Sequence, residues 1–458
     1  MHTYIKMGKI SRIGLATAAL ASVSSAYTLA ADNDVTIKDT ASQIAKGLFD
    51  TYYDAAATTG QFKQPESWFW WLSGTAWNGL LDYTLLTNDT TYKKPLMDAI
   101  YKNVGENFDF VPASQASWEA NDDQAYWVYN ALTAMEYSFD PLPCPGGGKA
   151  PCETDWVKLG TNAFDRFVSR WNADAGTCGG GLKWQFTPSA KGYDYKNSVT
   201  NGGFFQTAAR LARYTGNQTY ADWAVKVWDW STAVGFVSSD FHVIDGAGDG
   251  EFNCTKPDKN EWTYNSATYM MGAANMFAYT KGDKVWEQRV QGLVNTAKTQ
   301  FFTQDGIMRE ACENNGNRCN TDNTSFKSSL ARWMARTAVL VPSVKQTITD
   351  LLEKSATAAA KTCSGSTCGN LWTAATPLAG KQDFGTQLSA LEIVQSLLVL
   401  DAPLKLATAA GAAQPPLPRL SPPPRRLLSP NLPSRPSPRS SSSRVSTRRH
   451  RWLAMASQ

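Results

Sequence analysis

Residues 208–214 read AARLARY and residues 329–336 read SLARWMAR, and these two stretches indicate which fold to expect. In each, apolar and basic side chains recur at the spacing that gives an α-helix one apolar and one basic face. The same helical periodicity recurs along most of the chain, with little sign of the two-residue alternation of strands. It predicts twelve helices, near residues 40–57, 66–87, 92–104, 121–139, 155–171, 198–215, 217–235, 262–281, 283–303, 324–340, 342–361 and 384–401.

Twelve helices in sequence pairs predict an all-α fold, an (α/α)6 toroid or barrel of six helical hairpins. Residues 32–413, divided by six, give about 64 residues per pair, enough for two helices and two loops. A superhelical solenoid is the alternative, but no repeat motif recurs at a fixed period. Residues 236–261 are too rich in Gly and Asp for a helix and predict a long loop at the rim, with a short hairpin near Phe241 to Ile244.

The composition suits a folded protein with a large core, since 43% of the 458 residues are hydrophobic and 12% are aromatic. Of the three histidines, His242 is the one outside the terminal segments. A multi-histidine metal site is therefore excluded, and a Ser-His-Asp triad would have to use His242. Asp245 and Asp249 offer carboxylates for calcium, but they lack EF-hand spacing. We predict no metal and no cofactor.

The net charge of +4 hides an uneven distribution of charge. Residues 1–31 carry three basic residues and no acid, and residues 414–458 carry nine Arg and no acid. Subtracting these positive charges leaves residues 32–413 at −8. An acidic body argues against nucleic acid as a partner, because neutralising phosphates requires clustered Lys and Arg.

Both ends of the chain differ from the body. In residues 1–31, a basic start (Lys6, Lys9 and Arg12) precedes a short apolar run and small residues suited to cleavage after Ala30 or Ala31, which predicts a secretory signal peptide. A membrane span is the alternative, but the run is short and contains serines. Residues 414–458 hold ten Pro, ten Ser and nine Arg. They predict a disordered tail, which either touches acidic wall polymers or membranes or results from a wrong splice or reading frame.

Eight cysteines and four glycosylation sequons agree with a secreted protein. Spacing suggests three local disulfides and one longer bridge, although eight cysteines allow 105 pairings. A zinc site is the weaker alternative, because no CxxC pair occurs. The suggested pairs are Cys144 with Cys152, Cys312 with Cys319, Cys363 with Cys368, and Cys178 with Cys254, and the sequons lie at Asn88, Asn217, Asn253 and Asn323.

The motif most suggestive of chemistry is WEANDDQAYW at residues 118–127, where two adjacent carboxylates, Asp122 and Asp123, open a helix. Glycoside hydrolysis needs two carboxyl groups, one as acid/base and one as nucleophile. Repulsion between them would raise one pKa and supply the acid, while the helix dipole keeps the other ionised. The structural alternative is an ordinary helix start, with Asn121 as the N-cap and two acids favoured by the dipole.

Other polar and aromatic clusters suit a sugar site. WFWWLSGTAWN at residues 68–78 offers Trp for the core or for stacking on pyranose rings, and residues 195–205 and 261–265 combine amides with aromatic rings at helix starts. The residues predicted to bind sugar are Trp71, Trp118, Asn121, Trp127, Lys196, Asn197, Asn201, Phe204, Tyr264 and Asn265.

These motifs, in this order, resemble glycoside hydrolase family 76, most closely its fungal mannan endo-1,6-α-mannosidase branch. The resemblance is carried by ANDDQAYW at 120–127, the Trp-rich stretch at 68–78, NGGFF at 201–205 and WTYN at 262–265, and it covers about residues 35–402. It implies an (α/α)6 barrel that cleaves α-1,6-mannan with retention, with Asp122 as nucleophile and Asp123 as general acid/base. It also implies a secreted wall protein anchored by glycosylphosphatidylinositol. Residues 414–458 lack the hydrophobic tail that such an anchor signal requires.

Three functions follow as hypotheses. The first is an endo-acting hydrolase of cell-wall mannan, acting as a monomer. The second is a transglycosidase on the same site, which attaches anchored mannoproteins to wall glucan. The third is a non-catalytic mannan-binding wall protein, which the intact Asp pair disfavours because a lectin needs no such pair.

Overall fold

The computed structural model describes residues 26–57, 59–63, 70–142 and 155–401. These residues form twelve long helices and one short helix. The long helices are α1 (Asp34–Tyr52), α2 (Trp70–Thr87), α3 (Lys93–Lys102), α4 (Asn121–Glu136), α5 (Trp156–Ala173), α6 (Ser198–Thr215), α7 (Gln218–Ala233), α8 (Thr263–Tyr279), α9 (Lys284–Phe301), α11 (Thr321–Leu340), α12 (Lys345–Lys361) and α13 (Phe384–Asp401), and the short one is α10 (Asn314–Asn317).

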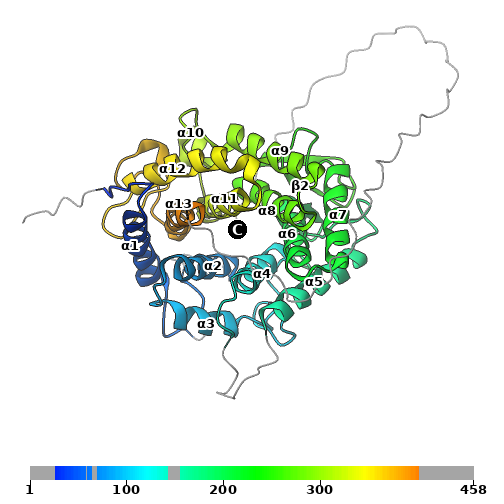
Figure 1. The fold of residues 1–458 in the computed structure, drawn as a ribbon. Coiled ribbons are helices and arrows are strands. Elements are labelled where there is room, and N and C mark those ends of the chain that lie inside the picture. Colours follow the sequence, from blue (N-terminus) through cyan, green and yellow to red (C-terminus); the bar gives the residue numbers. More distant parts are fainter. Residues whose placement is uncertain (1–25, 58, 64–69, 143–154, 402–458) are drawn as a thin grey trace, which may run out of the picture. The chain divides into compact units, whose positions relative to one another are not determined.

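The long helices form two concentric rings (Figure 1). Helices α2, α4, α6, α8, α11 and α13 contact one another in that order, and α13 packs on α2 to close the inner ring. Helices α1, α3, α5, α7, α9 and α12 lie outside them. Outer and inner helices alternate along the chain, so the predicted (α/α)6 toroid of six helical pairs is confirmed.

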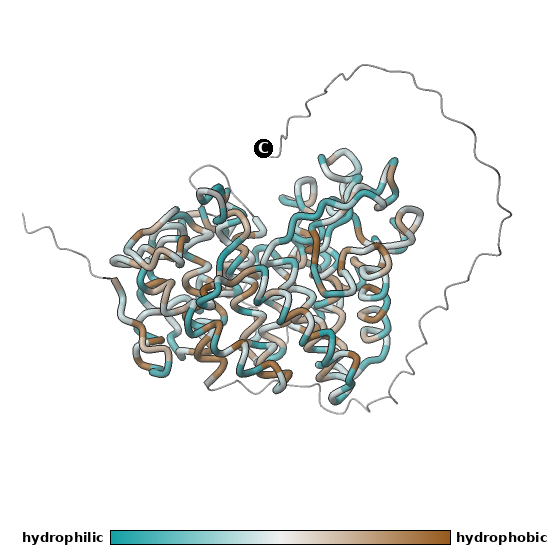
Figure 2. The backbone as a smooth tube through the Cα atoms, turned by 90° about the horizontal axis from the view of Figure 1, so that it is seen from above, coloured by the Kyte–Doolittle hydropathy of each residue, from teal (hydrophilic) through white to brown (hydrophobic). Residues whose placement is uncertain are grey.

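Burial separates the two rings. In the inner helix α6, every residue from Ser198 to Ala212 is buried, whereas the outer helix α9 buries one stripe, Trp286, Val290, Leu293, Val294, Ala297 and Phe301. A stripe at this spacing belongs to a helix with one face in water, and burial on all sides belongs to a helix with neighbours all round. Figure 2 shows the outcome along the chain, with brown apolar segments recurring in the helices and teal polar segments in several projecting loops.

The basic faces of AARLARY and SLARWMAR do not point into water as an amphipathic helix would predict. Arg210 is fully buried, and its Nη2 lies 2.8 Å from Glu136 of α4. Arg332 lies between Asp82, at 3.2 Å, and Glu392. Because both arginines belong to inner helices, their guanidinium groups are paired with carboxylates inside the ring.

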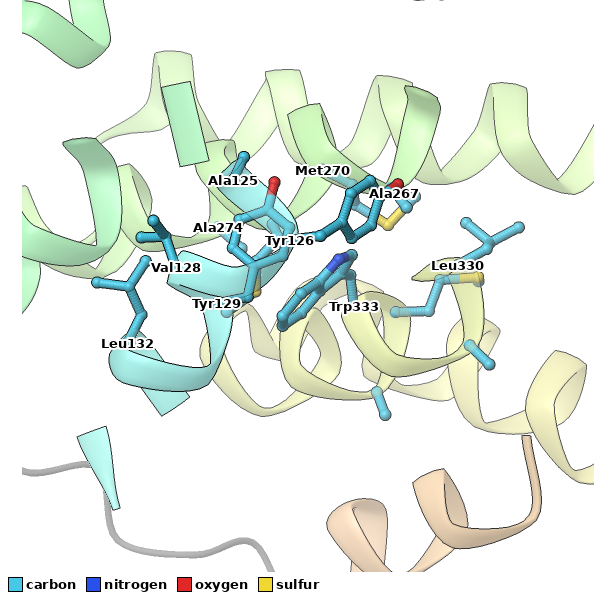
Figure 3. Packing of buried hydrophobic residues seen from close by; sticks show 14 of the residues in the cluster. Ala125, Tyr126, Val128, Tyr129, Leu132, Ala267, Met270, Ala274, Leu330 and Trp333 are labelled. Carbon is cyan, nitrogen blue, oxygen red and sulfur yellow. The ribbon is translucent and has the colours of Figure 1, made fainter. Parts of the chain in front are cut away.

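Aromatic side chains of different inner helices meet inside the ring. The rings of Tyr129 on α4 and Trp333 on α11 contact edge to face with centroids 5.4 Å apart. Figure 3 shows them pointing toward each other, with Tyr126 and Met270 of α8 beside them. Since α4 and α11 lie on opposite sides of the inner ring, these contacts fill its interior.

A small antiparallel sheet lies beside the helices. Its strands are β1 (Tyr195–Asn197), β2 (Ile244–Gly248) and β3 (Pro257–Glu261), in the order β1-β2-β3. The predicted hairpin near Phe241 to Ile244 is therefore displaced, because the paired strands begin at Ile244 and only the bridge between Val237 and Val243 precedes them. Strand β1 was not predicted.

Most helix bounds agree with the prediction, and the first does not. Helix α1 begins at Asp34 rather than near residue 40, because the Asn33 side chain accepts hydrogen bonds from the Val35 and Thr36 amides and caps the helix there. It ends at Tyr52 rather than near 57. Residues 26–31 of the predicted signal are described and pack on the domain, with Leu29 buried. Residues 1–25 and the predicted tail, 414–458, lie outside the described residues.

Three predicted disulfides are confirmed: Cys178–Cys254, Cys312–Cys319 and Cys363–Cys368. Cys144 and Cys152 lie outside the described residues. Of the predicted glycosylation sites, Asn88, Asn217 and Asn253 are exposed and Asn323 is half-buried. Within the described ranges, no helix is both long and apolar enough to cross a membrane, and no three His, Cys, Asp or Glu side chains are grouped to hold a metal.

Candidate active site

Asp122 and Asp123 lie in the first turn of α4 and are partly exposed. The Asp123 carboxylate accepts a hydrogen bond of 2.8 Å from the Ala120 amide, and the Asp123 amide donates to Asp122 Oδ1 at 3.1 Å. Ala120, not Asn121, is the N-cap residue. The predicted Asn121 cap is therefore wrong. The backbone N–H of the cap residue Ala120 is bound by the side chain of Asp123, three residues further along.

Asn121 instead fixes this turn to its surroundings. Its side chain donates to the Lys183 carbonyl at 2.9 Å, and its amide donates to the Trp184 carbonyl at 3.0 Å. Arg170 of α5 donates to Asn121 Oδ1 at 2.8 Å and to Gln124 Oε1 at 2.5 Å. An outer helix and the 182–185 segment thus hold the backbone that carries the two carboxylates, which is the support a catalytic pair needs.

Aromatic groups surround the pair. The Trp184 indole donates a hydrogen bond to Asp122. Trp71, at the start of α2, packs on Tyr126 of α4 with ring centroids 4.8 Å apart. Tyr264, at the start of α8, lies parallel to Phe326 of α11 with centroids 3.9 Å apart and an angle of 3° between the rings. Helix starts from four inner-ring positions therefore meet at this end of the barrel.

Burial and repulsion perturb the two carboxyls together. Burial raises the pKa of Asp122 well above its ordinary value, and the charge of Asp123 raises it further, while the Asp123 amide and the Trp184 indole lower it. Burial also raises the pKa of Asp123 to about 7, against the lowering effect of the Ala120 amide. Close carboxyls titrate as one system, so the pair retains a proton near neutral pH.

Two more acids contribute to the electrostatics of the site. Glu119 is buried, and burial together with the charge of Asp123 raises its pKa well above the ordinary range, against the opposing charge of Arg170. Asp322, in the first turn of α11, has its pKa raised to about 6 by burial, and the Trp71 indole donates a hydrogen bond to it. The charge of Asp322 in turn raises the pKa of Asp123.

Two of the ten residues predicted to bind sugar lie beside the pair. Trp71 and Tyr264 are both half-buried and contact the side chains described above. Trp118 is 80% exposed, on the loop before α4, and its predicted contact with sugar stays a prediction. Trp71 and Tyr264 present ring surface next to two carboxylates, an arrangement suited to a pyranose.

The other seven predicted contacts lie in the protein interior, and their contact with sugar stays a prediction. Their polar atoms or rings make contacts within the fold. The residues, with 5% exposure or less, are Asn121, Trp127, Lys196, Asn197, Asn201, Phe204 and Asn265.

Lys196 and Asn201 show what these interior residues do. The Lys196 ammonium donates to the carbonyls of Asp174, Thr177, Gly180 and Gly181 and so holds the Gly-rich loop that precedes Trp184. Asn201 Oδ1 accepts from the Leu182 amide at 2.8 Å, and its Nδ2 donates to the Leu182 carbonyl at 3.0 Å.

The remaining five serve local structure. Asn197 caps α6 by accepting from the Thr200 amide, and Asn265 donates to Asp245 at 3.5 Å. Trp127 donates to the Trp70 carbonyl at 3.0 Å. Phe204 packs among rings from α5 and α7, and Asn121 fixes the start of α4.

Three residues at the site were missed by the sequence analysis: Trp184, Asp322 and Phe326. Trp184 is a single tryptophan in a loop, and Asp322 is an ordinary acidic residue in the first turn of a helix. Asp322 also lies within the stretch TDNTS, residues 321–325, which holds the sequon at Asn323. No local pattern distinguishes Asp322 from the first-turn acids of the outer helices.

Comparisons with known proteins identify the family of this chain. The model of glycosyl hydrolase family 76 matches residues 36–409. The chain belongs to that family. Mannan endo-1,6-alpha-mannosidase DCW1 of Saccharomyces cerevisiae is 39% identical over 396 residues, which span 85% of each sequence. Mannan endo-1,6-alpha-mannosidase DFG5 of the same yeast is 40% identical over 390 residues, or 82% of each.

Solved structures of family 76 share the fold. Dfg5 from Chaetomium thermophilum in complex with glucosamine superposes with a TM-score of 0.74 at 32% identity, covering 83% of this chain and 94% of that one. An inactive variant of the α-1,6-mannanase GH76A of Salegentibacter sp. HEL1_6, in complex with α-1,6-mannotriose, superposes with a TM-score of 0.64 at 16% identity, covering 80% and 100%. The second likeness concerns the fold alone.

Proposed function

We propose that this family 76 enzyme cleaves internal α-1,6-mannosidic bonds of cell-wall mannan and retains the anomeric configuration. The observation that carries the proposal is the pair Asp122 and Asp123, two partly exposed carboxyls in one helix turn that is fixed from both sides. The named activity of the yeast relatives, mannan endo-1,6-alpha-mannosidase, supports α-1,6-mannan as the substrate class.

In this mechanism Asp122 attacks the anomeric carbon, and Asp123 donates its proton to the departing glycosidic oxygen. A glycosyl-enzyme ester forms on Asp122, and the leaving chain departs as an alcohol. Asp123, now a carboxylate, takes a proton from water, which attacks the anomeric carbon and releases Asp122. The sugar is inverted twice, so the product keeps the α configuration.

The surroundings of the two carboxyls suit these roles. When Asp123 holds the shared proton, its repulsion of Asp122 disappears. The Trp184 indole and the Asp123 amide then stabilise the Asp122 carboxylate as the nucleophile. Burial keeps the Asp123 proton bound up to about pH 7, as a general acid requires.

Secretion and a cell-wall location are part of the same proposal. The predicted signal of residues 1–31, the disulfides and the sequons at Asn88, Asn217 and Asn253, which are exposed, support an extracellular protein. The yeast relatives are named as mannan-active enzymes, and mannan is a wall polymer. Membrane attachment and a monomeric state stay predictions.

Product analysis tests the reaction. We expect proton NMR during cleavage of α-1,6-mannotetraose to show the α-anomer first, before mutarotation. First appearance of the β-anomer would contradict retention. A second reaction with added acceptor oligosaccharide separates hydrolysis from transfer, because a transglycosidase forms a longer product. Binding of the tetrasaccharide by calorimetry, without any cleavage by the wild-type protein, would instead support a non-catalytic mannan-binding protein.

A further inference from the structure

Several buried or half-buried acids lie near the helix starts at this end of the barrel, and their hydrogen bonding differs. Asp245 accepts from the Tyr195 hydroxyl at 2.8 Å, from Asn265 and from the Trp262 indole. Glu310 accepts from the Thr263 amide at 3.2 Å and from the Ala311 amide at 2.8 Å. These acids are satisfied by the protein and need no ligand.

Asp322 is different. Among the described residues, the Trp71 indole is the one hydrogen-bond donor to its carboxylate, whose Oδ1 has no partner. An ionised carboxylate has about four acceptor positions, so most of the capacity of Asp322 is open. A half-buried carboxylate in this condition is costly unless water or a ligand supplies donors.

The position of Asp322 favours a ligand over water as the source of these hydrogen-bond donors. It starts α11, which lies across the inner ring from α4 (Figure 1). Further along their length, α4 and α11 meet through Tyr129 and Trp333 (Figure 3). At the helix starts, the charge of Asp322 acts on Asp123, and the charges of Asp322 and Asp122 both act on Tyr264. Asp322 therefore faces the catalytic pair from the opposite wall.

A flat aromatic surface lies next to Asp322. Phe326, one helical turn further along α11, stacks against Tyr264 at 3.9 Å. The ring centroid of Trp71, whose indole holds Asp322, lies 6.4 Å from that of Phe326. Pyranose rings pair an apolar face with hydroxyl groups at the rim, so they match an aromatic surface beside a carboxylate.

We propose that Asp322, held by Trp71, binds the substrate by accepting hydrogen bonds from hydroxyl groups of a mannose unit, which packs against Tyr264 across from the catalytic pair. This deepens the proposed function and rests on it. The opposing explanation is that Asp322 only stabilises the start of α11 through the helix dipole.

Binding to an inactive enzyme tests the assignment directly. In an Asp122→Asn background, we expect α-1,6-mannotriose to bind, and the added change Asp322→Ala to weaken binding by about 10- to 100-fold, the loss of hydrogen bonds to a charged acceptor. Asp322→Asn keeps one acceptor oxygen and should lose less. Equal affinities with and without Asp322 would overturn this inference and leave the proposed function intact, whereas no binding to Asp122→Asn alone would count against the proposed function itself.

A matched variant separates binding from helix stability. Asp34 occupies the first turn of the outer helix α1, as Asp322 does in α11. We expect Asp34→Asn and Asp322→Asn to change the melting temperature by similar small amounts, while only Asp322→Asn raises KM. In addition, removing the Asp322 charge should move the fall in activity at high pH to lower pH, since that charge raises the pKa of Asp123. Unchanged KM and pH profile in Asp322→Asn would support the helix-dipole explanation alone.

Discussion

Helices α6 and α7 follow each other in the chain and have similar lengths, yet they are built on different principles. The inner helix α6 is buried from Ser198 to Ala212, including Arg210, Asn201 and Thr207. The outer helix α7 keeps most of its residues in partial or full contact with water and buries only one side, Ala221, Ala224, Val227, Trp228, Trp230 and Ser231. The same contrast separates the whole inner ring from the whole outer ring.

The comparison shows where each kind of residue acquires its role. Outer helices need only an apolar stripe, and their charged residues are exposed or half-buried. Inner helices are enclosed, so each polar group must find a partner inside the ring or face the site at its end. Arg332 and Asp82 pair in the interior, and Asp122 and Asp322 face the site. The following predictions compare the two rings, from the largest expected effect to the smallest.

Removing Asp122, a first-turn acid of the inner helix α4, should abolish activity. We expect Asp122→Asn to lower kcat on an α-1,6-mannan oligosaccharide by on the order of 10⁴-fold or more, because the amide cannot attack the anomeric carbon. The control is Asp34→Asn on outer helix α1, which should keep wild-type kcat. A stable Asp122→Asn enzyme with near-normal turnover would end the proposed mechanism.

Breaking an inner ion pair should cost more stability than any surface pair. Arg332 contacts both Asp82 and Glu392 inside the ring, and all three side chains are buried. We expect Arg332→Met to lower the free energy of unfolding by about 3–5 kcal/mol, since it leaves two buried carboxylates without this partner. Chemical denaturation measures the change. A loss below that of a surface pair would mean that the interior network is not energetically important.

The raised pKa of Asp123 predicts a loss of activity at high pH. A general acid must be protonated, and its pKa of about 7 places the fall in kcat/KM above neutral pH. Two pH units beyond, the rate should be lower by about 100-fold, ten-fold per unit. Asp34→Asn should not move this limb.

The raised pKa of Asp123 also makes the stability of the folded protein depend on pH. A carboxyl with a raised pKa in the folded state stays protonated when the unfolded chain has ionised, so stability falls as pH rises from about 4, the ordinary Asp value, to about 7. Asp123→Asn should make melting temperature less dependent on pH over that window. An equally steep dependence in the variant would assign it to other groups.

Adding one methyl group distinguishes inner packing from outer packing. A Cβ at Gly272 of α8 would lie 2.4 Å from the ring of Phe205, so we expect Gly272→Ala to cost about 1–3 kcal/mol through overpacking. At Gly160 of the outer helix α5 the nearest atom is a Leu132 methyl at 3.1 Å, and alanine favours the helix by about 1 kcal/mol. Gly160→Ala should therefore be near neutral, and equal losses for both would contradict the comparison.

The smallest effect should come from a surface pair on the outer ring. Lys46 and Asp50 of α1 are four residues apart and their side chains are more than half exposed. Lys46→Ala should lower the free energy of unfolding by about 0.3–0.5 kcal/mol. High salt should abolish this difference between variant and wild type, because it screens the ion pair in the wild type. A loss of several kcal/mol would mean that outer charges matter as much as inner ones.

The helices were predictable because their signal is local. Periodicity over ten to twenty residues identified all twelve long helices, and spacing suggested the three disulfides found in the structure. The start of α1 was missed because the cap formed by Asn33 precedes the apolar pattern. The site was predictable where its residues are adjacent, as in Asp122 and Asp123, and in Trp71 and Tyr264 near helix starts.

The sequence by itself determined a ring of helical pairs and a pair of adjacent carboxylates at a helix start. Its motifs also sufficed to indicate glycoside hydrolase family 76. The tertiary structure alone decided which helices are enclosed, and thereby the role of each polar side chain. It placed Lys196 and Asn201 in the interior and brought Asp322 and Trp184 to the site. The physical reason is range: helix formation depends on neighbours three or four residues away, whereas burial and pKa depend on charges and atoms brought together from distant parts of the chain.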